Sequence, residues 1–218
     1  MIIAIDGPSG SGKSTVGRLL ARELNLLYID TGSMYRAVAL AVIEGDLDPR
    51  DTEAIVALAD GLDIDLKGDP DSLKVLLHGR DVSEQIRSEP VTAMASIVST
   101  IPGVRRAMVK RQRAMGQRGA VLNGRDIGTV VFPDADLKFF LTAAPEERAE
   151  RRFKEDLTTN ANVSLSQTLA EMLDRDRRDS TRADSPLKVA DDAIVIDSSE
   201  LSIQEVLQRM MEYVHRNH

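Results

Sequence analysis

The chain has 218 residues, of which 42% are hydrophobic and 29% charged, a composition typical of a folded globular protein and not of a disordered one. Its 28 Lys and Arg residues against 35 Asp and Glu residues give a net charge of −7, which argues against charge-driven binding to a nucleic acid polymer or a membrane surface. The absence of cysteine excludes disulfides and cysteine-based metal sites. The apolar stretch from Met1 to Ile5 is too short for a signal peptide or a membrane span, so we expect a soluble, cytoplasmic protein.

Short apolar runs alternate with helical patterns along most of the chain. This alternation predicts an α/β fold, in which right-handed crossovers build a parallel sheet covered by helices on both faces. Ser202 and Glu205 form a capping box at the start of the last predicted helix. The predicted strands lie at residues 2–5, 26–29, 120–122, 137–141 and 193–196, and the predicted helices at residues 13–24, 33–44, 104–115, 146–157, 166–178 and 203–214.

Gly7 to Ser14 match the pattern G-x-x-x-x-G-K-S/T in full, between a predicted strand and a predicted helix. Glycines let this phosphate-binding loop turn its N–H groups inward at the positive end of the helix dipole. Lys13 is placed to reach the β- and γ-phosphates of a nucleotide, and the Ser14 hydroxyl to bind magnesium. The predicted ATP site consists of Gly7, Pro8, Ser9, Gly10, Ser11, Gly12, Lys13, Ser14 and Thr15.

Residues 60–89 interrupt the alternation of strands and helices. The runs 64–66 and 74–77 have strand character, and the turn-rich segments 67–71 and 78–81 follow them. We therefore expect a small antiparallel insertion outside the parallel sheet. We place it away from the phosphate-binding loop and expect it to serve a second substrate.

The loop alone does not distinguish switches, motors and kinases. A guanine-nucleotide switch needs an Asn-Lys-x-Asp segment, and the chain has no Asn-Lys pair. A motor or large ATPase is normally longer and has a strand that ends in paired acids, whereas the last predicted strand is followed by Asp197 alone. A small kinase fits these observations. A regulator that holds ATP without turning it over stays open as an alternative.

Three further segments resemble the signature segments of the bacterial cytidylate kinase family. They are Asp-Thr-Gly-Ser-Met-Tyr-Arg at 30–36, Asn-Gly-Arg-Asp-Ile-Gly-Thr-Val-Val-Phe-Pro at 123–133 and Arg-Asp-Arg-Arg-Asp-Ser-Thr-Arg at 175–182. Their order and spacing also fit, so the resemblance covers essentially the whole chain. A shikimate- or gluconate-type kinase is the alternative, but it accounts neither for the insertion nor for the Arg and Asp residues of the last segment.

The resemblance implies a three-layer P-loop nucleoside monophosphate kinase fold with a five-stranded parallel sheet, a small antiparallel insertion and a short lid. It implies transfer of the γ-phosphoryl group of ATP, with Mg²⁺, to CMP and also to dCMP. We expect small-molecule substrates only, no nucleic acid polymer, no membrane and a monomer. The implied regions are a core of residues 1–32, 101–144 and 164–218, an acceptor-binding region of residues 33–100 and a lid of residues 145–163.

Such a reaction must bring two phosphate anions together. At ~4 Å two like charges repel by ~4 kcal/mol at an effective dielectric of 20, so cations are needed where the phosphates meet. Arg36 and Arg125 are candidates, because a guanidinium group matches two phosphate oxygens, and the resemblance assigns both to the acceptor phosphate. The alternative for each is a surface ion pair.

Arg175, Asp179 and Arg182 are spaced to share one helical face. Without the resemblance they would be taken as an exposed ladder of ion pairs. The resemblance implies that Arg175 and Asp179 hold the ribose and that Arg182 helps to recognise the base. The roles of Arg177 and Arg178 stay open between solvated charge and assistance to the phosphates.

Cytosine and uracil differ in polarity at the amino or O4 position and at N3. A site with an acceptor for the amino group and a guanidinium for N3 or O2 leaves mismatched polar groups when uracil enters. The resemblance assigns this recognition to Ser96 and Arg105, with Asp126 nearby. The sequence alone favours a structural Ser96 on an Ala/Ser-rich helix. Thr31 completes the predicted substrate-binding set.

Arg148, Arg151 and Arg152 share a helical face in the predicted lid. We expect this lid to close over ATP, to bring arginine to the transferring group and to exclude water, with a mobile tip at residues 154–162. A helix surface paired with its own glutamates is the alternative. The predicted catalytic residues are Lys13, Arg125 and Arg151, and Asp30 either orients water around magnesium or caps the following helix.

Overall fold

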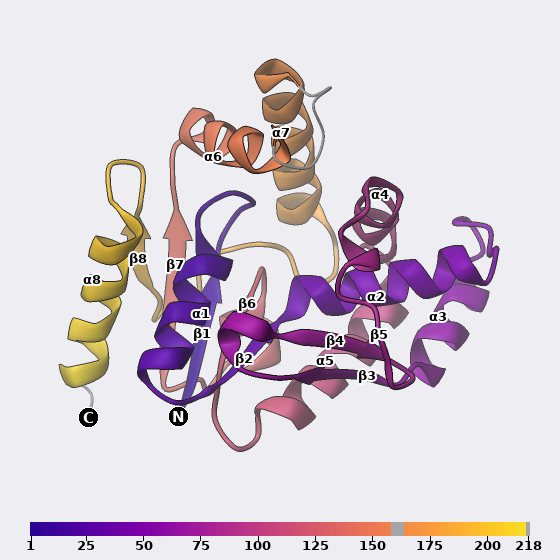
Figure 1. The fold of residues 1–218 in the computed structure, drawn as a ribbon, viewed down its shortest axis with the longest axis horizontal. Coiled ribbons are helices and arrows are strands. Elements are labelled where there is room, and N and C mark those ends of the chain that lie inside the picture. The colour runs from indigo at the N-terminus through magenta and orange to yellow at the C-terminus, as the bar shows by residue number, and fades with distance from the viewer. Residues whose placement is uncertain (158–163, 217–218) are drawn as a thin grey trace.

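The computed structural model describes residues 1–157 and 164–216, and its centre is a parallel sheet with the strand order β2-β6-β1-β7-β8 (Figure 1). The central strand β1 pairs with β6 on one side and with β7 on the other. The prediction of a five-stranded parallel sheet is therefore confirmed. The strands are β1 (Ile2–Asp6), β2 (Leu27–Asp30), β6 (Ala120–Gly124), β7 (Leu137–Thr142) and β8 (Ile194–Asp197).

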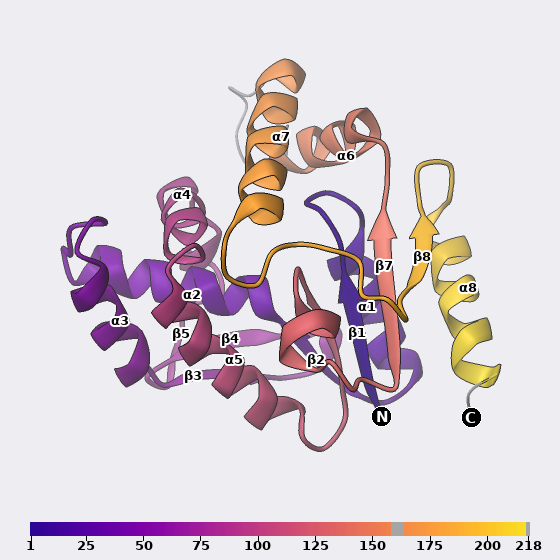
Figure 2. The same ribbon diagram turned by 180° about the vertical axis from the view of Figure 1, so that it is seen from behind.

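Helices cover both faces of this sheet, as Figures 1 and 2 show from opposite sides. One face packs against α1 and α8, and the other against the group formed by α2, α3, α4 and α5. In both views α6 and α7 lie beyond the carboxyl ends of the strands. The helices are α1 (Lys13–Glu23), α2 (Thr31–Glu44), α3 (Thr52–Gly61), α4 (Glu89–Val98), α5 (Pro102–Gly116), α6 (Pro145–Leu157), α7 (Leu165–Thr181) and α8 (Ile203–Arg216), with short turns η1 (Pro70–Ser72), η2 (Gln85–Arg87) and η3 (Ile127–Val131).

Alternating side chains of the central strand supply the two hydrophobic cores. Ile3 and Ile5 are fully buried in the core beneath α1 and α8, whereas Ala4 between them is fully buried in the core beneath α2 and α5. This period of two is the geometry of a strand that is buried on both faces. The position of the phosphate-binding loop directly after β1 is therefore fixed from both sides of the sheet.

The insertion is a separate antiparallel sheet of β3 (Ile64–Lys67), β4 (Lys74–Leu77) and β5 (Arg80–Asp81), as predicted. An ion pair of 2.6 Å between Arg80 and Glu44 ties β5 to the end of α2. The insertion also contacts α1, because Asp71 in η1 pairs with Arg22 at 3.1 Å. Arg22 lies in the last turn of α1, at the end of the helix away from the phosphate-binding loop, so this contact does not contradict the expected placement of the insertion.

All six predicted helices are present, with ends that differ by only a few residues. The capping box is confirmed, since Ser202 N donates to Glu205 Oε2 at 2.8 Å and Glu205 N to Ser202 Oγ at 3.3 Å. Helix α3 was missing from the predicted set, and α4 was expected only as an Ala/Ser-rich helix around Ser96, without bounds. A local signal exists for α3, because the Asp51 side chain caps it by accepting from Ala54 N at 3.0 Å.

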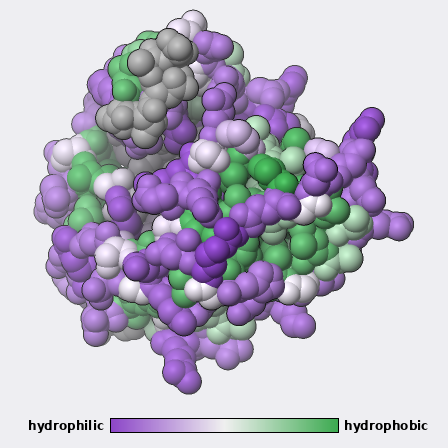
Figure 3. Space-filling view, turned by 45° about the vertical axis from the view of Figure 1, so that its right-hand side comes forward, coloured by the Kyte–Doolittle hydropathy of each residue, from purple (hydrophilic) through white to green (hydrophobic). Residues whose placement is uncertain are grey.

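Hydrophilic residues cover most of the face in Figure 3, although hydrophobic residues gather on its right-hand side. The large hydrophobic side chains that are exposed include Ile43 of α2 and Ile97 of α4. None of the helices in the described part of the chain combines the length and the apolar character needed to cross a bilayer. The predicted lid tip lies partly outside the described residues, because positions 158–163 are not among them.

Candidate active site

A cleft of about 1320 Å³ opens at the carboxyl ends of the parallel strands. In open α/β sheets this is the edge at which ligands bind. The phosphate-binding loop, the start of α2, the end of α7, the predicted lid helix α6 and part of the insertion all contribute to its walls. Of the predicted site residues, the cleft is lined by Ser9, Gly10, Ser11, Gly12, Lys13, Ser14, Thr15, Asp30, Thr31, Arg36, Arg105, Arg125, Asp126, Arg151, Arg152, Arg175, Asp179 and Arg182.

The phosphate-binding loop curls around the amino group of its own lysine. Lys13 Nζ donates to the Pro8 carbonyl at 2.5 Å and to Ser11 Oγ at 3.3 Å, and the lysine is only 6% exposed. Burial, followed by the positive charges of Arg125 and Arg175, lowers the pKa of Lys13 well below its usual range. A cation in this position gains stability from an anion that enters the loop.

Two glycines allow the loop to approach its neighbours closely. Gly7 has φ +148°, and a Cβ atom there would lie 2.0 Å from the Leu141 carbonyl oxygen. Gly10 has φ +74°, and its Cβ atom would lie 2.8 Å from the Arg148 carbonyl oxygen. Side chains at either position would displace the loop from β7 or from the lid helix, which is why glycine is required there.

A buried ion pair fastens the tip of the loop. Arg148 Nη1 donates to the Ser9 carbonyl at 2.9 Å and to Asp176 Oδ2 at 2.5 Å, and Asp176 Oδ1 accepts from Ser9 N at 3.4 Å. Arg148 was expected to share a cleft-facing surface with Arg151 and Arg152. In this structure it is 5% exposed and does not line the cleft, because its guanidinium group is bonded to protein atoms of the loop and of α7.

The other two lid arginines do line the cleft. Arg151 Nη2 donates to the Ser198 carbonyl at 2.5 Å, and the Ser198 hydroxyl in turn donates to the Ser11 carbonyl at 3.2 Å. Arg152 pairs with Asp156 at 2.8 Å, within its own helix. Arg151 is therefore held beside the phosphate-binding loop, whereas Arg152 has the self-paired arrangement that the sequence left open.

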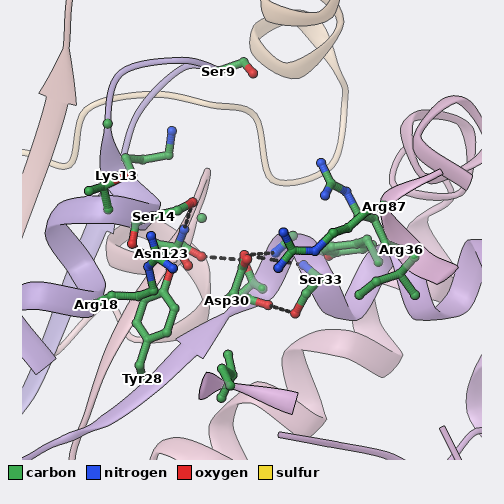
Figure 4. Close-up of a pocket in the computed structure, with 18 of the residues that line it drawn as sticks. Ser9, Lys13, Ser14, Arg18, Tyr28, Asp30, Ser33, Arg36, Arg87 and Asn123 are labelled. Carbon is green, nitrogen blue, oxygen red and sulfur yellow. Dashed lines mark hydrogen bonds between the residues drawn. The ribbon is translucent and has the colours of Figure 1, made fainter. Parts of the chain in front are cut away.

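Oxygen ligands gather where β2 and β6 end (Figure 4). Asn123 Nδ2 donates to Ser14 Oγ at 2.9 Å, and the buried Oδ1 atom of Asn123 has no hydrogen-bond partner within the described part of the chain. Thr31 Oγ1 donates to the Asn123 carbonyl at 2.7 Å. Asp30 Oδ1 caps α2 by accepting from Gly32 N at 3.1 Å. The capping role considered for Asp30 is thus present, and Asp30 also lines the cleft.

Three arginines that line the cleft, Arg36, Arg125 and Arg175, have only one carboxylate bonded to them among the described residues. Among the described residues, neither Arg36 nor Arg175 has a hydrogen bond or an ion pair, while Arg125 Nε donates to Asp179 Oδ2 at 3.0 Å. Burial, followed by the charge of Arg125, lowers the pKa of Arg175 to about 10. Burial also lowers the pKa of Arg36. This excess of half-buried positive charge makes the region suited to a polyanion.

A buried polar group lies deeper in the cleft. Arg105 Nη2 donates to Asp126 Oδ2 at 2.5 Å, and the two side chains are 2% and 7% exposed. Arg182 lies 3.7 Å from the other carboxylate oxygen of Asp126. Tyr35 supports this group, because the Arg105 guanidinium lies over its ring at 5.4 Å.

Ser96 differs from the other residues expected in the acceptor site. Its hydroxyl accepts from Arg178 Nη1 at 2.6 Å, and Ser96 does not line the cleft in this structure. Arg178 also pairs with Asp174 at 3.0 Å, one turn earlier in α7. The bond to Ser96 therefore joins α4 to α7 and distinguishes Arg178 from Arg177, which pairs with Asp174 alone.

Several residues of the site were not predicted. Asp6 accepts from Ile127 N at 2.8 Å and from Gly128 N at 2.7 Å, and so braces the segment that carries Arg125 and Asp126. Burial raises the pKa of Asp6 to about 6. Asp6 could have been predicted as a site residue, because it lies directly before the phosphate-binding loop in the sequence. Asn123 and Asp176 also belong to the site, and both lie within the segments 123–133 and 175–182 that carry the family resemblance, although neither was given a role there. Ser198 and Arg87 border the site and lie in no such segment.

Comparison with known proteins decides the family. A family model described as cytidylate kinase matches residues 3–216. The chain belongs to the cytidylate kinase family. Relatives named cytidylate kinase include one from Caldicellulosiruptor saccharolyticus, 49% identical over 98% of this chain and 95% of its own length, and one from Geobacter sp. strain M21, 47% identical over 96% and 91%.

Membership of the cytidylate kinase family makes the protein a kinase, that is, a phosphotransferase. It also decides against a regulator without turnover and against a shikimate- or gluconate-type kinase. Among solved structures, an uncharacterised protein from Eubacterium ventriosum is similar with a TM-score of 0.52 and 14% identity, over 99% of this chain and 98% of the other. That likeness concerns the fold alone.

Proposed function

We propose that this kinase transfers the γ-phosphoryl group of ATP to CMP, and also to dCMP, to give ADP and CDP or dCDP. The observation that carries the acceptor assignment is a pair of buried nitrogens, Arg105 Nε and Arg182 Nη2, that lack a hydrogen-bond partner among the described residues. Both side chains line the cleft. Because a buried donor without a partner is costly, these nitrogens favour a ligand that presents acceptors. Cytosine presents them at N3 and O2, whereas uracil carries an N–H at N3.

The carboxylate beside these donors has the opposite polarity. Asp126 uses Oδ2 for Arg105, while its Oδ1 lies 3.7 Å from Arg182, beyond hydrogen-bond distance. That oxygen is an acceptor for the exocyclic amino group of cytosine. Uracil would place its O4 atom against the same carboxylate, which leaves two acceptors facing each other. The polarity of this group therefore supports cytosine over uracil.

The ribose would lie between the base and the phosphate, beside α7. Asp179 accepts hydrogen bonds from Arg125 at 3.0 Å and from Arg182 at 3.4 Å, so it connects the phosphate side of the cleft to the base side. Burial raises the pKa of Asp179, but the charges of Arg125, Arg175 and Arg182 outweigh this effect and lower it, so the carboxylate is ionised and accepts a ribose hydroxyl. Base and phosphate are common to CMP and dCMP, which is why the proposal includes both.

The acceptor phosphate itself is the nucleophile, so no general base is required. Arg36 and Arg125 would grip its oxygens, and Lys13 with the N–H groups of the loop would hold the phosphates of ATP. The main catalytic task is to neutralise the charges of the two phosphates as they approach each other, because their repulsion of ~4 kcal/mol at ~4 Å opposes the in-line geometry. Arg151, held beside the loop through Ser198, is placed to stabilise charge on the transferring group.

Closure of the lid over the donor would exclude water and prevent wasteful hydrolysis of ATP. Of the lid arginines, Arg152 would exchange its partner for a phosphate most easily, because its ion pair with Asp156 lies within one helix and such pairs contribute little stability. Arg148 supports the lid from its base by fixing the loop tip. Ser96 would enter the base site only if α4 and α7 move relative to each other.

Magnesium fits the residues at the end of β2 and β6. Mg²⁺ prefers oxygen ligands and keeps several waters, so one or two protein oxygens and the phosphates complete its shell. Ser14 would bind it directly, Asp30 would orient its water, and the unpartnered Oδ1 of Asn123 is a further acceptor for such water. The ion would neutralise negative charge on the phosphates.

We further propose the division into a core of residues 1–32, 101–144 and 164–218, an acceptor-binding region of 33–100 and a lid of 145–163. The protein would act as a monomer in the cytoplasm. A coupled assay of ADP release across CMP, dCMP, UMP, AMP, GMP and shikimate tests the function. We expect CMP and dCMP to be preferred, and preference for any other acceptor would overturn the substrate assignment.

A further inference from the structure

Arg87 is an arginine of the insertion that projects over the cleft. It ends the short turn η2, whose Ile86 is 3% exposed and packs into the core shared with α2 and α4. The Nε atom of Arg87 donates to the Ser83 carbonyl at 3.3 Å. Arg87 lines the cleft. The buried isoleucine and this hydrogen bond fix the base of the side chain and leave its end toward the cleft.

The end of this side chain lies near another arginine. Figure 4 shows Arg36 and Arg87 together, across from Lys13 and Ser14. Burial is the main cause that lowers the pKa of Arg36, and the charges of Arg152 and Arg87 lower it further. Two guanidinium groups that repel each other are stabilised when an anion binds between them. The arrangement therefore favours a phosphate on this side of the cleft.

Three exposed arginines outside the cleft are paired. Arg50 pairs with Asp48 at 2.8 Å, Arg22 with Asp71 at 3.1 Å and Arg80 with Glu44 at 2.6 Å. Within residues 1–157 and 164–216, no ion pair joins Arg87 to a carboxylate, and its two terminal nitrogens have no hydrogen-bond partner. Glu84 lies on the same short segment and also lines the cleft, but it does not pair with Arg87.

We propose that Arg87 binds the phosphate of the acceptor nucleotide, so that the insertion supplies one of the cations at the point of transfer. This inference rests on the proposed function, since it concerns the phosphate of that acceptor. Arg36 approaches the phosphate from α2 and Arg125 from the end of β6, and Arg87 adds a third direction from η2. The ion pair between Arg80 and Glu44 ties the insertion to α2, which keeps Arg87 and Arg36 in one unit.

The test compares a nucleotide with its nucleoside. Arg87→Met removes the charged group and keeps much of the aliphatic stem, and Arg87→Lys keeps a charge without the planar fork. Lys67→Met is the matched control, because Lys67 is an exposed cation of the same insertion that does not line the cleft. For each variant we would measure the KM for CMP, the KM for ATP and the inhibition constant of cytidine, which lacks the phosphate.

Arg87→Met should raise the KM for CMP by about 10-fold to 100-fold, the loss of a charge-assisted hydrogen bond, with little change in the inhibition constant of cytidine. Arg87→Lys should lie between this variant and the wild type, and Lys67→Met should match the wild type. A KM for CMP that does not change in Arg87→Met would overturn the proposal. Equal weakening of CMP and cytidine, with a lowered Tm, would also overturn it, because a structural role affects both ligands.

A wrong function proposal and a wrong role for Arg87 would give different results. If the wild type prefers another nucleoside monophosphate, the base assignment is wrong, but the same comparison with that nucleotide and its nucleoside still decides the role of Arg87. A phosphate-specific loss with the preferred nucleotide supports the inference, and an equal loss with its nucleoside contradicts it.

Discussion

The buried pair of Arg105 and Asp126 gives a prediction about stability. Asp126→Asn removes the carboxylate charge next to an arginine that is 2% exposed. At the 2.5 Å nitrogen–oxygen distance, the gross attraction is roughly 7 kcal/mol for an effective dielectric of 20. Desolvation of both ions offsets most of this attraction. The loss of one partner leaves a buried charge uncompensated, which costs about 3–5 kcal/mol of the free energy of unfolding.

Replacing Asp126 and replacing Arg105 should lower the free energy of unfolding by different amounts. Asp126→Asn leaves two guanidinium groups, Arg105 and Arg182, without their carboxylate, and the charge of Arg105 already contributes to lowering the pKa of Arg182, after burial. Arg105→Met instead leaves Asp126 with Arg182 at 3.7 Å. We therefore expect Asp126→Asn at the upper end of the range of about 3–5 kcal/mol, and Arg105→Met at its lower end.

Urea unfolding at neutral pH, followed by far-ultraviolet circular dichroism, measures both variants against the wild type. Arg50→Met is the matched control, since it breaks an ion pair with Asp48 in which the arginine side chain is 90% exposed. The control should leave the free energy of unfolding unchanged within error. A loss of about 1 kcal/mol or less in Asp126→Asn would refute the reasoning, as would a larger loss in Arg105→Met than in Asp126→Asn.

Three further predictions follow from the site. Lys13→Ala should lower turnover by at least about 100-fold with an unchanged circular dichroism spectrum, and near-normal rates would contradict the assignment of the loop. Because burial raises the pKa of Asp6 to about 6, ionisation of this carboxyl opposes folding. The free energy of unfolding of the wild type relative to Asp6→Asn should be highest below about pH 4 and should fall by roughly 3 kcal/mol between about pH 4 and pH 6. Denaturation at a series of pH values measures this difference, and a difference that does not depend on pH would disprove the prediction. Arg178→Gln, which frees the Ser96 hydroxyl from its bond to α7, should raise the preference for CMP over UMP by about 3-fold to 10-fold in competition assays, whereas Arg177→Gln should not; equal selectivity in the two variants would exclude this bond as the contact that keeps Ser96 away from the base.

Much of the fold was predictable because its signals are local. Each strand of the parallel sheet is a short apolar run, and the loop after β1 has a pattern whose spacing is set by the phosphates it wraps. The antiparallel insertion was visible as strand character around turn residues. Helices α3 and α4 were harder to predict, since both are short, with ten residues each, and much of their burial comes from packing against α5 and α2.

The positions of the site side chains were less predictable, because long-range contacts decide them. Helical spacing places Arg148, Arg151 and Arg152 on one face, but Arg148 turns to Ser9 and Asp176, which lie 139 and 28 residues away along the chain. The partner of Ser96 is 82 residues away. No local pattern encodes such contacts, because they depend on how α6 and α7 pack against the loop and on how α7 lies beside α4.

Asp176 joins the donor site to the lid. One of its oxygens accepts from Ser9 N in the phosphate-binding loop, and the other pairs with Arg148 at the base of α6. If α6 moves as the proposed lid helix, its movement would displace the backbone of the phosphate-binding loop. Such a connection is reciprocal in free energy: if closure of the proposed lid tightens ATP binding by some factor, bound ATP favours the closed lid by the same factor. In this proposal, a single carboxylate would link the position of the lid to the occupancy of the loop.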